Sequence, residues 1–202
     1  MKIPLSLYPK LNVVDLFDVE FELTTIISEF DNGEIPEEYT IKIKYEDKVI
    51  GLAKIYKIST LGANDLFYMC DGFSSNLTDI FLNITKSGRN GNFQYIKPLA
   101  VFDDYSTFIF IDEIGIEAEY RGNGILENLL VALDNFFGND CIQLLLASPL
   151  SYSNKVFNRL ETFGTKEFEL IRKKIINSYK KSNFIQIKQG SPYMYKINLV
   201  DN

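Results

Sequence analysis

The chain contains no histidine among its 202 residues. Histidine is the usual proton acceptor of Ser-His and Cys-His nucleophilic pairs and a common zinc ligand, so its absence excludes these sites. A proton-transferring group in this chain must therefore be an Asp, Glu, Tyr, Lys or Cys side chain. We expect no metal site.

Cysteines and long apolar runs are also scarce. Cys70 and Cys141 are the only cysteines, which is typical of a reduced, cytoplasmic chain, and a disulfide between them is the alternative that stays open. No apolar run of about 18 residues is present, and the opening MKIPLSLYPK is too short and too interrupted by proline for a signal peptide. We therefore expect a cytoplasmic protein without a membrane partner.

The composition that remains is that of a folded domain. Hydrophobic residues make up 46% of the sequence, and the formal net charge is −6. The length and the apolar fraction predict a single domain over residues 1–202. The negative charge argues against nucleic acid and anionic membranes as partners, and it favours a cationic substrate such as an amine.

The most informative stretch runs from residue 108 to residue 137. Residues 108–116 form an apolar, β-branched and aromatic run, typical of a strand that is buried on both faces. Arg121-Gly122-Asn123-Gly124 supplies a tight turn, because both glycines can adopt positive φ. Residues 125–137 follow a helical spacing that ends at Gly138-Asn139. Free amides of a turn at a helix N-terminus make an anion site.

Two other phosphate-binding motifs fail in this stretch. A dinucleotide fingerprint needs a third glycine where this chain has Glu127, and a nucleoside-triphosphate loop needs a Gly-Lys-Ser/Thr sequence that is absent. A plain strand–helix turn, in which the glycines only make the chain bend sharply, is the remaining alternative.

This strand–turn–helix resembles the acyl-CoA loop of the GNAT superfamily of N-acyltransferases. The family pattern is Arg or Gln, two residues, Gly, one residue, then Gly or Ala; this chain has Arg121, Gly122, Asn123, Gly124, Ile125 and Leu126, so that Leu126 departs from the pattern. The resemblance implies that these six residues hold the pyrophosphate of acetyl-CoA, with Ile114 and Ile116 beside the acyl-pantetheine arm. A backbone N–H near Ile116, exposed by a bulge that Gly115 permits, is expected to polarise the thioester carbonyl.

A stretch near the C-terminus carries the same resemblance. From Lys166 we expect a helix with one apolar stripe, formed by Phe168, Ile171, Ile175 and Tyr179. Residues 179–184, YKKSNF, are similar to the Y-x-x-x-G-F that ends the fourth GNAT helix; Asn183 replaces Gly, and Asn also adopts the left-handed conformation. The resemblance gives Tyr179 the role of protonating the departing thiolate, which suits a phenol. A core tyrosine with a hydrogen-bonded hydroxyl is the alternative.

Two adjacent acids interrupt the buried strand. Asp112 is the first candidate for the general base, Glu113 the second and Glu117 the third. Strand alternation sends Asp112 and Glu113 to opposite faces of the sheet, so only one of them is expected to face the acceptor. A solvent-exposed strand end is the alternative, and an amine can also lose its proton through water.

The remaining patterns predict a mainly antiparallel sheet. The expected strands are residues 16–28, a hairpin of 39–45 and 49–58 with a turn at 46–48, 141–146 parallel to 108–116, and a closing hairpin of 184–188 and 193–199. Ser74 or Ser75 can cap a helix whose buried stripe is Leu77, Ile80, Phe81 and Ile84. Cys70 is expected in a loop and buried rather than nucleophilic.

Three segments differ from the family pattern. Residues 1–38 are an atypical N-terminal strand region, residues 60–98 are an insertion beside the acceptor, and residues 150–165 are a second insertion with a short helical stretch at 156–163.

The predicted fold is α/β (α+β in some schemes), with a central mixed, mostly antiparallel twisted sheet, a splayed parallel strand pair and flanking helices. The resemblance implies an N-acetyltransferase that moves an acetyl group from acetyl-CoA directly to an amine acceptor, a small molecule or a peptide, without a metal. The rival hypothesis is a catalytically silent GNAT-like module that binds acyl-CoA or a protein partner. A third is a protein that binds another phosphorylated ligand at Gly122–Gly124. A homodimer is compatible with each.

Overall fold

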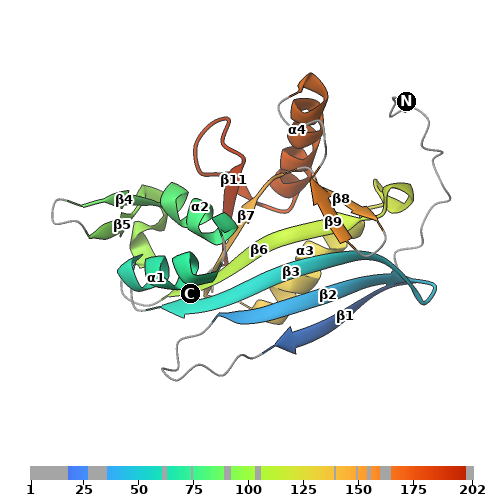
Figure 1. Ribbon diagram of the computed structural model, residues 1–202, viewed down its shortest axis with the longest axis horizontal. Helices are drawn as coiled ribbons and strands as arrows, with labels where there is room; N and C mark the ends of the chain where they lie inside the picture. The colour runs from blue at the N-terminus through green and yellow to red at the C-terminus, as the bar shows by residue number, and fades with distance from the viewer. Residues whose placement is uncertain are drawn as a thin grey trace.

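The protein has a mixed α/β fold built on a seven-stranded sheet (Figure 1). The structure, a computed structural model, describes residues 18–26, 36–60, 63–73, 75–88, 92–102, 106–138, 140–148, 150–153, 156–159 and 165–198. The strands of the sheet are β1 (Val19–Ile26), β2 (Glu37–Tyr45), β3 (Lys48–Thr60), β6 (Ser106–Ile116), β7 (Cys141–Leu146), β11 (Tyr193–Asn198) and β10 (Ile185–Gln186), in this spatial order. Neighbouring strands are antiparallel except β6 and β7, which are parallel, so the predicted fold class is confirmed.

Four α-helices lie against this sheet in the described part of the chain. They are α1 (Ala63–Phe73), α2 (Ser75–Ile84), α3 (Ile125–Phe137) and α4 (Lys166–Lys181). Two short hairpins, β4 (Thr85–Ser87) with β5 (Phe93–Tyr95) and β8 (Leu150–Ser153) with β9 (Val156–Arg159), stand outside the main sheet. The 3₁₀ turns η3 (Lys97–Phe102) and η4 (Ala118–Tyr120) flank β6 in sequence.

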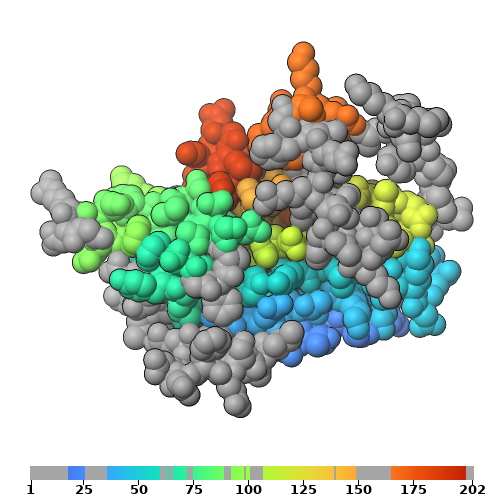
Figure 2. All heavy atoms as spheres, viewed as in Figure 1, coloured from blue at the N-terminus to red at the C-terminus, as the bar shows by residue number. Residues whose placement is uncertain are grey.

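The sheet separates two apolar cores. Ile109 and Ile111 of β6 belong to one core with α3 and α4, whereas Phe108 and Phe110 belong to the other with α1 and α2. Successive strand residues point to opposite faces, which is why both faces of β6 are apolar. We call these sides the α3 face and the α1–α2 face. In Figure 2 the segment from α1 to β5 gathers over one end of the sheet.

The N-terminal strands follow the predicted alternation. β1 pairs antiparallel with β2, and β2 and β3 form the expected hairpin, with Glu46 and Asp47 at positive φ of 48° and 63°. A two-residue turn with both φ values positive matches the right-handed twist of the flanking strands. Residues 16–17, 27–28 and the predicted turn at 31–33 lie outside the described residues.

The parallel pair β6–β7 is joined by α3 as a crossover. Pairing runs from Thr107 opposite Cys141 to Ile111 opposite Leu145. β7 ends at Leu146, whereas β6 continues to Ile116 and remains paired with β3 on its other edge. The two parallel strands therefore share only the first part of β6, as expected for a splayed pair.

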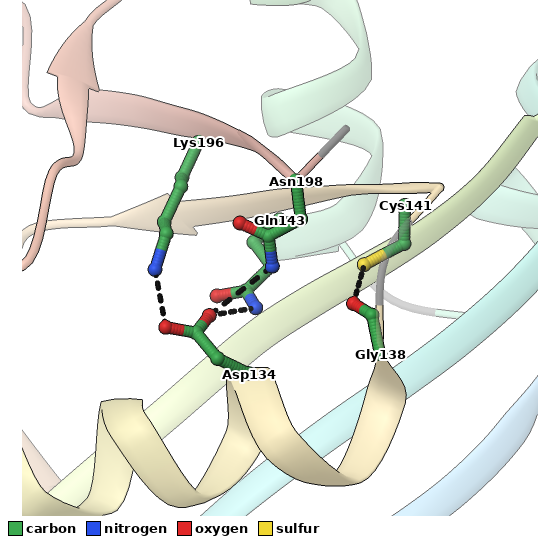
Figure 3. Close-up of polar contacts among 6 residues, drawn as sticks. All are labelled: Asp134, Gly138, Cys141, Gln143, Lys196 and Asn198. Atoms are coloured by element: carbon green, nitrogen blue, oxygen red, sulfur yellow. Dashed lines mark hydrogen bonds and ion pairs between the residues drawn. The ribbon is translucent and has the colours of Figure 1, made fainter. Parts of the chain in front are cut away.

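A polar cluster fixes α3 on the sheet (Figure 3). Asp134 of α3 accepts hydrogen bonds from Gln143 Nε2 at 2.8 Å and from Asn198 Nδ2 at 3.1 Å, and it pairs with Lys196. Gln143 is fully buried in β7, and Lys196 is nearly so in β11. Because polar groups in a core are costly unless paired, these contacts fix where α3 sits along β7 and β11.

Residues 60–98 contain more regular structure than predicted. α1 places Cys70 in a helix, so the predicted loop there is wrong, although Cys70 is fully buried as expected and both cysteines are free. Its apolar residues Ala63, Leu66 and Cys70 recur at helical spacing and meet the α1–α2 core. The predicted stripe of α2 is confirmed, since Leu77, Ile80, Phe81 and Ile84 are all buried.

The prediction for residues 150–165 is also corrected. Residues 156–159 were expected in a short helix, but they form β9, which pairs with β8. The partner strand supplies hydrogen bonds that a helical pattern in sequence does not reveal. Residues 160–163 lie outside the described residues. The β8–β9 hairpin lies alongside β6 (Figure 1).

Candidate functional site

The glycine turn before α3 has the predicted conformation. Gly122 and Gly124 adopt φ of 82° and 79°, and α3 starts at Ile125. The first intrahelical bond runs from Asn128 N–H to Gly124 O at 3.0 Å. The amides of residues 125–127 therefore have no acceptor within the helix. They point out of its positive end, where an anion binds favourably.

Side chains hold this turn against the end of β6. Arg121 Nε donates to Ile116 O at 2.8 Å, and Asn123 Nδ2 donates to Tyr120 O at 3.0 Å. Lys48 contacts Glu117 at 2.9 Å, and its ammonium lies 5.1 Å from the Tyr120 ring centroid. A Cβ on Gly122 would meet nothing within 4 Å, so the space above this residue is open. Side chains thus hold the turn in place, and the space beside Gly122 is open.

Past Ile111, the edge of β6 that faces away from β3 pairs with no strand in the described part of the chain. Glu117 N–H donates to Ile50 O of β3 at 2.8 Å. Hydrogen-bonded and non-hydrogen-bonded pairs alternate in an antiparallel ladder, so Ile116 and Ile114, opposite Gly51 and Ala53, direct their backbone groups away from β3. Pairing with β7 has already ended at Ile111. The N–H groups of Ile114 and Ile116 therefore face the side on which β7 has diverged.

The β6 bulge lies at a different residue from the one predicted. Gly115 stands in regular register opposite Leu52, whereas the register shifts between Lys54, opposite Glu113, and Ile55, opposite Ile111. Asp112 is the extra residue. The close approach in this region requires Gly51 of β3, because a Cβ on Gly51 would lie 2.6 Å from the backbone oxygen of residue 115. The prediction of a bulge at Gly115 is therefore wrong. The bulge lies at Asp112, which is the first candidate for the general base.

This bulge also overturns the prediction that the two acids face opposite sides. Ile111 and Ile114 both pack in the α3-face core, with Asp112 and Glu113 between them. Glu113 stands opposite Lys54 of β3. Residues two apart in a strand share a face, and Tyr56, two residues after Lys54, belongs to the α1–α2 core. A bulge inserts one residue and breaks alternation. Both carboxylates therefore lie on the α1–α2 face.

Asp112 lies in a half-buried polar environment. Asn76 Nδ2 of α2 donates to Asp112 Oδ1 at 2.9 Å. Burial raises the pKa of Asp112 above its ordinary value, while the hydrogen bond from Asn76 and the charge of Lys54 oppose this and the charge of Glu38 adds to it. A carboxylate with a raised pKa is a better proton acceptor than an exposed one.

Glu117, the third candidate for the general base, forms an ion pair with Lys48. Glu117 accepts from Lys48 at 2.9 Å, and Lys48 also contacts Glu119 at 3.2 Å. These pairs raise the pKa of Lys48 above its usual range, as expected for an ammonium held by two carboxylates. Glu117 therefore supports the turn, and it is not brought together with Asp112.

Tyr179 occupies the predicted place on α4. It is buried in the α3-face core together with Ile176, and its ring lies 5.7 Å from that of Phe184 in an edge contact. Asn183 adopts φ of 67°, and Phe184 N–H donates to Tyr179 O at 3.1 Å, which confirms the left-handed end of the helix. Burial raises the pKa of the Tyr179 phenol above its usual range. Ile171 and Ile175, predicted in the stripe, are only half buried.

The structure thus divides the predicted site between two faces. Tyr179 lies on the α3 face and Asp112 on the α1–α2 face. Between these two faces, the sheet is interrupted where β6 stops pairing with β7 after Ile111. The sequence did not identify Asn76, Lys54 or Glu38 as neighbours of Asp112. A lysine on the neighbouring strand could have indicated a contact with the acids of β6, but the sequence does not give the register between the two strands.

Within the described residues, no group of three or more Cys, Asp or Glu side chains is arranged to hold a metal ion. No helix in this part of the chain is both long and apolar enough to cross a membrane. Comparisons with protein-family models, curated proteins and solved structures give no match to this chain. The fold and the site together define a mixed α/β protein in which a glycine turn and the start of α3 lie beside the part of β6 that no longer pairs with β7.

Proposed function

We propose that the protein is a GNAT-like N-acyltransferase, which moves an acetyl group from acetyl-CoA to an amine. One observation carries the proposal. The hydrogen bond from Arg121 to Ile116 O brings the anion-binding turn directly against the end of the unpaired β6 edge. A ligand with a pyrophosphate at one end and an amide-rich arm at the other matches both parts, since the turn offers amides to the anion and β6 offers strand-like hydrogen bonds.

The chemistry divides among groups that the structure describes. The N–H groups of Ile114 and Ile116 are directed to the side where the thioester carbonyl would lie, and they can stabilise the oxyanion of a tetrahedral intermediate. Asp112 accepts the proton of the amine before attack. The nitrogen of the tetrahedral intermediate loses its second proton to water. When the carbon–sulfur bond breaks, the thiolate takes the proton of Tyr179, and Tyr179 is restored from solvent. No covalent intermediate on the protein is needed.

Several further properties belong to this proposal. The acceptor is an amine of a small molecule or a peptide, consistent with a net charge of −6, and neither nucleic acid nor a membrane is a partner. We place the protein in the cytoplasm on its free cysteines, Cys70 and Cys141. Acetyl-CoA acts as co-substrate, held by residues 121–126, without a metal.

The test is a thermal-unfolding panel with acetyl-CoA, longer acyl-CoAs, NAD, ATP and inorganic phosphate. Acetyl-CoA should stabilise the protein by about 2.7 kcal/mol at a hundredfold excess over its dissociation constant. NAD and ATP should stabilise it less. The proposal fails if no acyl-CoA raises the melting temperature at millimolar concentration.

A silent acyl-CoA-binding module is the second candidate. Leu126 supports it, since this side chain packs against the α3-face core at a position where the family pattern has a small residue. The module would show the same thermal shift, but it would release no free thiol from acetyl-CoA with any of a panel of primary amines. Thiol release therefore separates the two functions.

A further inference from the structure

We propose that Asn76 positions Asp112 to take the proton of the acceptor amine, so that the helix pair α1–α2 forms one wall of the acceptor site. This inference rests on the proposed acyl transfer. It adds a residue and a direction of approach that the resemblance does not supply, because α1 and α2 belong to the inserted segment.

The first argument is geometric. Asn76 is the second residue of α2, and the helix is anchored next to it by Leu77 and Ile80, both buried. Its Nδ2 donates to Asp112 Oδ1 at 2.9 Å. Asp112 Oδ2 makes no hydrogen bond to any other residue that the structure describes. Asn76 thus fixes one carboxylate oxygen from a rigid helix and leaves the other available for a proton.

The second argument is electrostatic. The groups that face Asp112 are Asn76 of α2, Lys54 and Tyr56 of β3, Glu38 of β2 and its own neighbour Glu113. Lys54 is shared, since its ammonium lies 3.5 Å from Glu38 and 5.3 Å from the Tyr56 ring centroid. No cation is therefore dedicated to Asp112 in the described part of the chain. The charged form of Asp112 therefore depends more on the neutral donor Asn76 than it would if the carboxylate had an ion-pair partner of its own.

The third argument concerns the proton balance. The N–H bond of the ammonium breaks, its electron pair stays on nitrogen, and the proton bonds to Asp112 Oδ2. The neutral amine then attacks the thioester carbonyl, its nitrogen loses a second proton to water, and the departing thiolate takes the proton of Tyr179. Asp112 returns its own proton to solvent after the product leaves. A carboxylate that rotates freely would present either oxygen in several directions, whereas the bond from Asn76 selects one.

The experiment compares Asn76→Ala with a matched control, Asn83→Ala. Asn83 lies on the same helix, but its Nδ2 donates to Asp79 O at 2.8 Å and not to Asp112. The Asp112 carboxyl is titrated by ¹³C NMR in both variants, with Asp112→Asn to assign its signal. Asn76→Ala should raise the pKa of Asp112, because a donor to the charged form is lost, and Asn83→Ala should leave it unchanged.

Activity is measured as thiol release from acetyl-CoA, with benzylamine, lysine methyl ester and a tripeptide as probe amines. Asn76→Ala should lower kcat about tenfold and shift the acid limb of the kcat/KM profile to higher pH. An unchanged Asp112 titration, or an equal loss of kcat in both variants, overturns the role of Asn76 but not the proposed acyl transfer. If the wild-type protein binds no acyl-CoA, the proposed function fails first, and this inference fails with it.

Discussion

Arg121 Nε donates a 2.8 Å hydrogen bond to the carbonyl oxygen of Ile116. The contact joins the glycine turn to the last residue of β6, so the guanidinium is engaged by the protein's own backbone. Its charge remains near the turn, but one of its donors is committed. We infer that Arg121 shapes the turn, while the amides at the start of α3 carry most of the anion recognition.

The first prediction follows from this division. Gly124→Val should abolish acetyl-CoA binding, because a β-branched residue at φ of 79° distorts the turn and fills the approach to its amides. Arg121→Ala should weaken binding about tenfold or less. Isothermal titration measures both. If Arg121→Ala is the more damaging of two folded variants, side-chain charge dominates recognition.

A matched control separates local strain from lost binding. Gly190 adopts φ of 80° in the turn before β11, and a Cβ there would meet nothing within 4 Å. Gly190→Val therefore carries a similar backbone penalty far from the turn. It should lower the melting temperature as Gly124→Val does, with acetyl-CoA affinity unchanged.

The second prediction concerns the proposed acid. Tyr179→Phe keeps the ring and its edge contact with Phe184. The hydroxyl makes no hydrogen bond to another described residue, so the free energy of unfolding should change by less than about 1 kcal/mol. Turnover should fall by roughly 10²–10⁴ with acetyl-CoA affinity unchanged. Tyr195→Phe, a buried tyrosine on the α1–α2 face, is the control and should keep the full rate.

The strongly patterned elements were predictable from local sequence. The bounds of α3 are the predicted ones, because helical spacing begins after Gly124 and stops at Gly138, whose φ of 72° ends the helix. The stripe of α2 and the left-handed Asn183 were predictable for the same reason, since each depends only on its near neighbours.

The bulge at Asp112 was not predictable, because it is a relation between two strands. Sequence alternation within β6 says nothing of the extra residue until β3 sets the register, with Glu113 opposite Lys54 and Ile111 opposite Ile55. The same holds for the hydrogen bond from Asn76 to Asp112, which joins residues 36 positions apart. The site was therefore predictable as a set of motifs, but its two faces were not.

The third prediction is a pH dependence of stability. The pKa of Asp112 is higher in the folded protein than its ordinary value, chiefly through burial. The folded state therefore binds this proton more tightly, and stability falls as pH rises from the ordinary pKa of about 4 through the folded value. Asp112→Asn should raise the melting temperature at pH 7, and the gain should vanish in acid. A gain that is the same at both pH values would contradict the assignment.

The last prediction concerns the cluster beneath α3. Lys196→Met removes the cation of the Asp134 pair and leaves the carboxylate with only Gln143 and Asn198, so unfolding in urea should show a loss of about 3 kcal/mol. Adding Asp134→Asn removes the stranded charge while the amide oxygen still accepts from Gln143, and this double variant should recover at least half of the loss. Lys42→Met is the control, because its partner Glu22 lies on the exposed strand face and such pairs contribute little. If the double variant is no more stable than Lys196→Met alone, the cost lies in lost packing of the lysine stem and not in the unpaired charge of Asp134.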